Sequence, residues 1–81
     1  MRPAPSTYAT NDFYFACFLR AKGYPLADVA REGTRTSFVF HERPPREVVL
    51  GYFNSTALVE AGRLVGAIKD LRALLYSGVS R

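Results

Sequence analysis

The apolar positions near the start of the chain repeat with the period of an α-helix. Residues Asn11 to Lys22 are predicted to form a helix with Thr10 as its N-cap and Gly23 after its last turn. Phe15 and Leu19 fall on one side of this helix, and the remaining apolar side chains fill a broad arc made of Phe13, Tyr14, Cys17, Phe18 and Ala21. The stripe expected to face solvent is Asp12, Ala16 and Arg20.

A helix that is apolar on most of its circumference needs cover on more than one side. In a chain of 81 residues that cover has to come from another helix or from a second copy of the chain. We therefore predict a homo-oligomer with Phe15 and Leu19 at its interface. Gly66, on the polar side of a later helix, is a further candidate because it would allow a second chain to approach closely.

The next segment alternates apolar and polar residues, which is typical of β-strands. Residues 26–31 and 34–41 are predicted to form a hairpin that turns at Glu32-Gly33, and residues 8–10 a short edge strand. Pairing Arg31 with Thr34 places four apolar side chains on one face, namely Ala27, Val29, Phe38 and Phe40. The opposite face then carries Arg35, Ser37, Val39 and His41.

Two helices are predicted in the second half of the chain. The first runs from Pro45 to Phe53, because proline is tolerated in a first turn, with Val48, Val49, Tyr52 and Phe53 on one face. The second runs from Glu60 to Tyr76 and has an apolar stripe of Ala61, Leu64, Val65, Ile68, Leu71 and Leu75. Residues 56–59 fit either a short strand or the entry to this last helix.

These elements give the order (β)-α-β-β-α-(β)-α. The predicted fold is α+β, a small single domain whose hairpin or short antiparallel sheet has three helices packed on it. Residues 1–6 contain two prolines and are expected to be a loose arm, residues 7–77 the folded core and residues 78–81 a tail.

Composition excludes several classes of protein. Hydrophobic residues make up 48% of the chain, which excludes intrinsic disorder. The longest apolar run, Phe13 to Leu19, is much shorter than the roughly 20 residues that span a bilayer, and the N-terminus lacks the apolar core of a secretory signal. One cysteine, Cys17, cannot form an internal disulfide, so the expected location is the reducing cytoplasm. We expect no membrane partner, no metal and no cofactor.

Charge supplies the candidate contact residues. The net charge is +4, and nine of the eleven basic residues are arginines, which suit planar partners such as phosphate or carboxylate. The candidates for contact with a nucleic acid or a protein partner are Arg20, Arg35, Arg43, Arg46, Lys69 and Arg72. Arg72 is the first to test. Its alternatives are that its stem covers the edge of the core or that it pairs with an acid such as Asp12.

Phe38 and Phe40 beside Arg35 invite comparison with the strands of RNA-recognition modules, where aromatic side chains stack on bases. The order of elements is similar to that of such a module. However, residues 35–40 lack the glycines and the full aromatic spacing of the motif. Alternating Phe residues on a central strand more often belong to the core, and this interpretation is favoured.

Catalytic chemistry has little support in the sequence. His41 and Cys17 are the only pair that could act as base and nucleophile, and no third group is placed to orient them. The acidic residues show no paired-carboxylate spacing, and there is no phosphate-binding loop. We expect no enzymatic activity and assign no catalytic residue.

Short motifs along the chain resemble those of a small uncharacterised family, known as a domain of unknown function in bacteria and their phages. The motifs are Thr10-Asn11-Asp12-Phe13-Tyr14-Phe15-Ala16, Phe18-Leu19, Gly23-Tyr24, Phe38-Val39-Phe40, Tyr52-Phe53-Asn54 and Lys69-Asp70-Leu71-Arg72-Ala73-Leu74-Leu75-Tyr76. They extend over about residues 7 to 77. The resemblance implies an origin in a bacterium, phage or mobile element, and it implies no activity.

Two functions remain open at this point. The favoured one is a non-enzymatic, self-associating binding module with nucleic acid as the leading ligand class. The alternative is an adaptor or inhibitor that binds a host or phage protein and has no nucleic-acid role.

Overall fold

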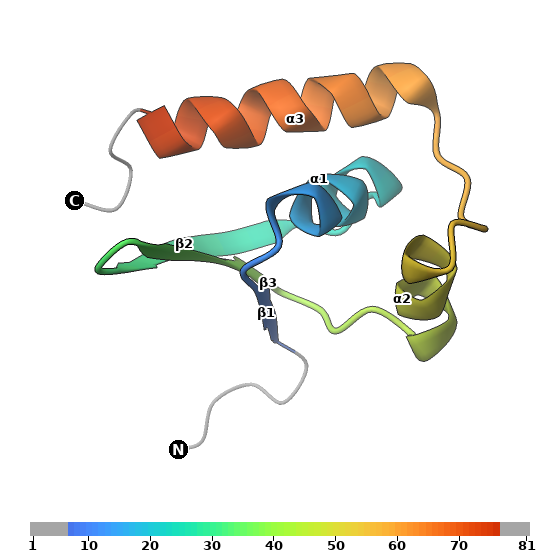
Figure 1. The fold of residues 1–81 in the computed structure, drawn as a ribbon, viewed down its shortest axis with the longest axis horizontal. Helices are drawn as coiled ribbons and strands as arrows, with labels where there is room; N and C mark the ends of the chain where they lie inside the picture. The colour runs from blue at the N-terminus through green and yellow to red at the C-terminus, as the bar shows by residue number, and fades with distance from the viewer. Residues whose placement is uncertain (1–6, 77–81) are drawn as a thin grey trace.

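The computed structural model describes residues 7–76 and has α+β architecture, as predicted. The elements are β1 (Tyr8–Thr10), α1 (Phe13–Lys22), β2 (Leu26–Glu32), β3 (Arg35–Phe40), α2 (Arg46–Phe53) and α3 (Ala61–Tyr76). The strands form one antiparallel sheet in the order β1-β3-β2. Helices α1 and α3 lie on one face of this sheet, and α2 stands beside α1 at the far end from the hairpin (Figure 1). The expected arm at 1–6 and tail at 78–81 lie outside the described residues.

Helix α1 begins two residues later than predicted. Asp12, not Thr10, is the N-cap, and its Oδ1 accepts a hydrogen bond of 3.0 Å from the backbone N–H of Phe15. Thr10 is the last residue of β1, and its hydroxyl accepts a hydrogen bond from the N–H of Asp12. Gly23 ends the helix as predicted, at a φ of 106° that suits glycine.

The buried side of α1 is wider than its periodicity indicates. Ala16, placed on the solvent-facing stripe, is fully buried, and Tyr14, placed on the apolar arc, is 57% exposed. Phe15 and Leu19 are 1% and 0% exposed in the single chain. The sheet, α3 and the aromatic residues of α2 enclose α1, so the chain itself supplies the cover, which is the first of the two sources that the sequence allows. Placing Phe15 and Leu19 at an interface between copies is therefore wrong.

The hairpin forms with a register shifted by two residues from the predicted one. Arg31 pairs with Thr36 and Val29 with Phe38, and the turn lies at Gly33-Thr34, with Gly33 at a φ of 64°. A shift of two keeps the faces, so Val29, Phe38 and Phe40 are buried as expected. Ala27 is wrongly placed in the core. The register is irregular between Leu26 and Asp28, so Ala27 is exposed and Leu26 lies opposite Phe40.

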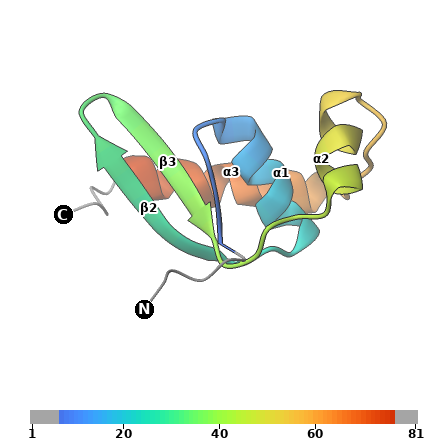
Figure 2. The same ribbon diagram turned by 90° about the horizontal axis from the view of Figure 1, so that it is seen from below.

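The sheet has one face without helices. Figure 2, the view from below, shows the strands in front of α3. This face carries small and charged side chains, namely Ala9, Asp28, Ala30, Glu32, Arg35, Ser37 and Val39. Asn11, the residue after β1, also binds β3. Its side-chain amide donates hydrogen bonds to the Thr36 carbonyl (3.2 Å) and the Ser37 hydroxyl (2.9 Å).

Helix α3 is rotated relative to its predicted stripe. Ala67 and Leu71 are buried, with Leu64, Ile68, Leu74 and Leu75 partly buried beside them, whereas Ala61 and Val65 are exposed. Residues 56–59 form no strand. The N–H groups of Thr56 and Ala57 both donate to the carbonyl of Gly51, which folds this segment back onto the end of α2.

Candidate functional site

The two arginines before and at the start of α2 border an apolar pocket. Its lining comes from β1, the connection after β3 and the first turns of α2, namely Tyr8, Arg43, Pro44, Arg46, Val49 and Leu50, and its volume is about 370 Å³. The guanidinium of Arg43 lies over the ring of Tyr8, 5.6 Å from its centroid. Tyr8 in turn meets Phe15 of the core edge-on, with the ring centroids 6.3 Å apart. The pocket is therefore anchored to the core on its Tyr8 side.

Local sequence explains why these side chains meet here. Pro44 is buried after β3, and Pro45 precedes the first helical residue, Arg46, with a fixed φ of −60°. The proline pair ends the strand and starts the helix within a few residues, so Arg43 and Arg46 stay on the same side of the molecule. Glu42 and Glu47 next to them are exposed and reduce the net charge of the pocket rim.

Helix α2 is held to the core through aromatic side chains. The ring of Tyr52 lies 5.0 Å from that of Phe15 and 5.1 Å from that of Phe18, and Phe53 lies 5.2 Å from Phe15. Phe53 nevertheless stays 57% exposed, and Leu50 is 45% exposed. These two side chains make α2 an apolar helix on the surface, next to the arginine-bordered pocket. We call Tyr8, Arg43, Arg46, Val49, Leu50 and Phe53 the α2 surface.

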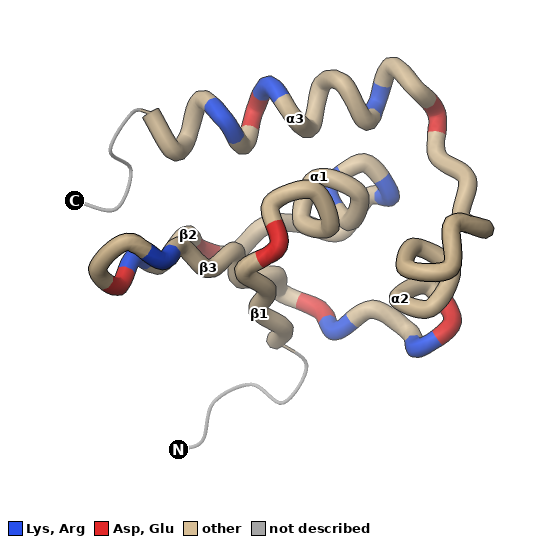
Figure 3. Tube along the Cα trace, viewed as in Figure 1, with Lys and Arg blue, Asp and Glu red and all other residues tan. Residues whose placement is uncertain are grey.

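The other predicted contact residues lie elsewhere. Arg35 is at the hairpin end, where it pairs across the strands with Glu32. Arg72 is exposed on α3 and lies 5.8 Å from the ring centroid of Phe13, which agrees with the interpretation that it covers the edge of the core. Lys69 is exposed on α3. Basic and acidic positions alternate along the trace and do not gather on one element (Figure 3).

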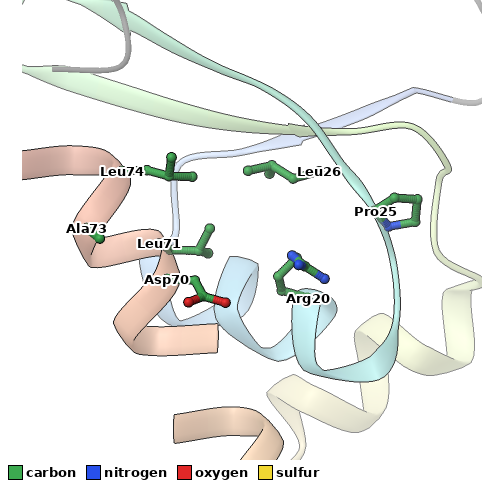
Figure 4. Close-up of a pocket in the computed structure, with 7 residues that line it drawn as sticks. All are labelled: Arg20, Pro25, Leu26, Asp70, Leu71, Ala73 and Leu74. Carbon is green, nitrogen blue, oxygen red and sulfur yellow. The ribbon is translucent and has the colours of Figure 1, made fainter. Parts of the chain in front are cut away.

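Arg20 lines a second hollow, a groove between α1, the start of β2 and α3. Its volume is about 510 Å³, and Figure 4 shows Arg20 and Asp70 facing it from two different helices. The apolar part of the groove consists of Pro25, Leu26, Leu71, Ala73 and Leu74. Gly66 lines a smaller adjoining hollow of about 230 Å³, together with Arg20 and Asp70. The structure therefore divides the predicted contact residues among several places, and only Arg43 and Arg46 share an apolar pocket.

The aromatic strand residues offer no stacking surface. Phe38 and Phe40 are 1% and 0% exposed and point into the core that the helices cover. The open face of the sheet carries no aromatic side chain within the described residues. The favoured interpretation of these residues as core is confirmed.

The two side chains considered for catalysis, Cys17 and His41, lie in different environments: the first is buried and the second is exposed. Cys17 lies in the core, and desolvation raises the pKa of its thiol to about 11, with a smaller opposing effect of the Arg72 charge and a smaller raising effect of Asp12. A thiol with this pKa is protonated at neutral pH and is a poor nucleophile. His41 is exposed after the end of β3. Over residues 7–76 no group of three or more His, Cys, Asp or Glu side chains could hold a metal ion.

Sequence reasoning missed the apolar half of the α2 surface. The sequence pattern places Phe53 on the packing face of its helix and indicates no binding role for Leu50 or Tyr8. The signal in the sequence was the apolar content of the short segment from Val48 to Phe53, which exceeds what one side of a two-turn helix can bury.

Within residues 7–76 no helix is both long enough and apolar enough to cross a membrane.

Comparisons with curated proteins and with solved structures gave no match. A family model does match, and it covers residues 5–77, close to the span of the resemblance seen in the sequence. The chain therefore belongs to the family described as Domain of unknown function (DUF5659).

Proposed function

We propose that this domain is a non-enzymatic binding module that recognises a protein partner through the α2 surface. The observation that carries the proposal is one apolar pocket lined by two arginines and the exposed Leu50, on a short helix whose Phe53 is also exposed. Aromatic residues and arginine are enriched at protein–protein interfaces, and the side chains that contribute most to binding are often aromatic or arginine residues in well-packed pockets.

The chemistry of the pocket defines the segment that would fit. An apolar side chain would fill the space between Tyr8 and Val49, and a neighbouring carboxylate would meet Arg43 or Arg46. Arginine can bind a carboxylate with two parallel hydrogen bonds, so the pair would fix the orientation of the segment. The proposed ligand is an acidic protein segment with an apolar anchor.

Nucleic acid, which the sequence favours as the ligand, becomes the second candidate. The net charge of +4 and the preference for arginine still favour it. Against it, the basic positions are scattered and interleaved with acids, and the strand phenylalanines are buried. Nucleic-acid binding usually depends on a basic patch that follows the phosphates, so the protein partner is the stronger proposal.

The burial of Cys17 supports the non-enzymatic part of the proposal, because the only cysteine is protonated in the core at neutral pH. A single thiol is also typical of the reducing cytoplasm, which we propose as the location. An origin in a bacterium, phage or mobile element follows from the resemblance of the sequence motifs and belongs to the same proposal.

A selection from displayed random dodecapeptides tests the proposed function. The full chain is compared with Arg43→Gln/Arg46→Gln and with the control Arg35→Gln/Lys69→Gln, which removes the same charge at exposed positions elsewhere. We expect recovered peptides to carry an apolar residue next to Asp or Glu. Binding to the first variant should fall at least tenfold, and binding to the control should change less than twofold.

Two results would contradict the proposal. One is a set of peptides that binds Arg43→Gln/Arg46→Gln as tightly as the unmodified chain. The other comes from fluorescence anisotropy with single- and double-stranded oligonucleotides at low salt. Salt-sensitive binding much tighter than that of an unrelated basic protein would favour nucleic acid instead.

A further inference from the structure

The groove side of α3 carries two opposite charges with a glycine between them. Arg63, Gly66 and Asp70 line the same hollow. Its other lining residues are Arg20 and Ala21 of α1 and Ala67 of α3. Arg63 and Asp70 are two helical turns apart, so they project from the same flank of α3. This hollow continues into the groove of Figure 4, since Arg20 and Asp70 line both.

The charged side chains on this flank make few interactions within their own chain. Asp70 makes no ion pair in the part of the chain that the structure describes. Arg63 pairs with Glu60 at 3.6 Å, and both side chains are largely exposed. An exposed pair of this kind is weak and easily exchanged for another.

Gly66 is also unexplained by the packing of its own chain. A Cβ atom added there would meet nothing within 4 Å, so no neighbour in the chain requires a glycine. Glycine is among the least favourable residues in a helix interior. Because it has no side chain, Gly66 leaves free space on the helix surface between Arg63 and Asp70.

We propose that this flank binds a second copy of the chain, with the two α3 helices antiparallel. A two-fold axis passing beside Gly66 and Ala67 would bring the same flanks together, because a closed dimer uses one self-complementary surface twice. Arg63 of each copy then faces Asp70 of the partner subunit, and Arg20 adds a second cation to the same groove. Gly66 allows the closest approach of the two helices at the axis.

This interface differs from the one predicted at Phe15 and Leu19, which are enclosed by their own chain. It also lies apart from the α2 surface, since the two sets of lining residues share no member. The dimer and the recognition of a protein partner can therefore succeed or fail independently.

Sedimentation velocity of the full chain over a range of concentrations tests the charge pairing. We expect a monomer–dimer equilibrium at low salt. Asp70→Arg should lower the association constant at least tenfold, because both reciprocal pairs become repulsive. The double reversal Arg63→Asp/Asp70→Arg should recover part of this loss, because the pairs between copies reform with exchanged signs, while Arg20 and Glu60 now lie near like charges.

A second pair of variants tests the close approach. Gly66→Gln and Gly62→Gln both place a good helix former where an added Cβ meets nothing, but Gly62 does not line the hollow. Both should raise the thermal midpoint of the monomer, and only Gly66→Gln should reduce dimerisation at least tenfold. The proposal is overturned by a chain that stays monomeric up to about millimolar concentration. It is also overturned by a dimer that keeps its association constant in both Asp70→Arg and Gly66→Gln.

Discussion

Cys17 shows how the environment of one side chain changes its chemistry. The thiol is buried among aromatic and aliphatic neighbours, and burial raises its pKa from the ordinary value of 9.0 to about 11. In the unfolded chain the thiol loses its proton near pH 9, while in the folded chain it keeps the proton to about pH 11. The unfolded state therefore binds fewer protons in this range. The free energy of unfolding should fall as the pH rises from 9 to 11, by about 2–3 kcal/mol in total.

Replacing this side chain should alter the pH dependence in a defined way. Cys17→Ala should cost about 1 kcal/mol at pH 7, because it leaves a small cavity in the core. Between pH 9 and 11 the variant should lose about 2 kcal/mol less than the unmodified chain. Burial also raises the pKa of Tyr52, with smaller raising effects of the Asp12 and Cys17 charges, so the difference between the two proteins contains the thiol and its minor effect on Tyr52. Urea unfolding at pH 8, 9.5 and 11 provides the measurement, and two parallel pH profiles would show that the thiol is not desolvated.

Single residues were the least predictable level of the structure. Ala16 is buried although the pattern places it in solvent, and Tyr14 is exposed although the pattern places it in the core. A small side chain fits where α1 packs against its neighbours, and the large ring of Tyr14 does not. Ala27 left the core because the register of β2 is irregular between Leu26 and Asp28. Periodicity gives the average direction of a side chain, whereas these positions depend on how closely a neighbouring element approaches.

At the scale of elements, the ends of α1 illustrate what local sequence determines. The sequence predicts the end of the helix at Gly23 correctly, because a positive φ after a helix strongly favours glycine. The predicted start is wrong because Thr10 and Asp12 are both good caps, and the choice between them depends on β1 pairing with β3 through Thr10. Strand pairing with a distant segment therefore decided which of two suitable residues caps the helix.

This assignment predicts different costs for the two residues. Asp12→Ala should destabilise the protein by about 1 kcal/mol, because the N–H of Phe15 loses its acceptor, while Asp12→Asn should be nearly neutral. Thr10→Ala should cost less than Asp12→Ala, since its hydroxyl binds only the N–H of Asp12 at an exposed site. Urea-induced unfolding at pH 7 measures all three. A larger cost for Thr10→Ala would indicate that Thr10 is the N-cap, as the sequence predicts.

At the scale of the whole molecule, the order of elements and the α+β class were predictable, because each helix and strand has its own period and its own turn residues. The side of α3 that faces the core was predicted only in part. Val65 lies beside Leu64 and Ile68 in the sequence pattern, but the helix packs on α1 with Ala67 inward and Val65 exposed. Such a rotation depends on the packing of two helices that are distant in sequence.

The distribution of charge was the property that the sequence could not predict. Eleven basic residues give a basic protein, but only the fold determines whether they gather. Arg43 and Arg46 come together because the proline pair keeps them on one side of the chain, whereas Arg20, Arg35, Lys69 and Arg72 separate onto different elements. The candidate site therefore retains two of the predicted contact residues and gains the apolar side chains around them.

The central claim is that the α2 surface receives an acidic segment with an apolar anchor. NMR titration of the ¹⁵N-labelled chain with a selected peptide tests it most directly, with the same peptide carrying an amide in place of its carboxylate as the control. We predict that the largest shift changes occur at Tyr8, Arg43, Arg46, Val49 and Leu50, and that the amide peptide binds at least tenfold more weakly. Changes centred on the hairpin or on α3, or equal binding of the two peptides, would contradict the account.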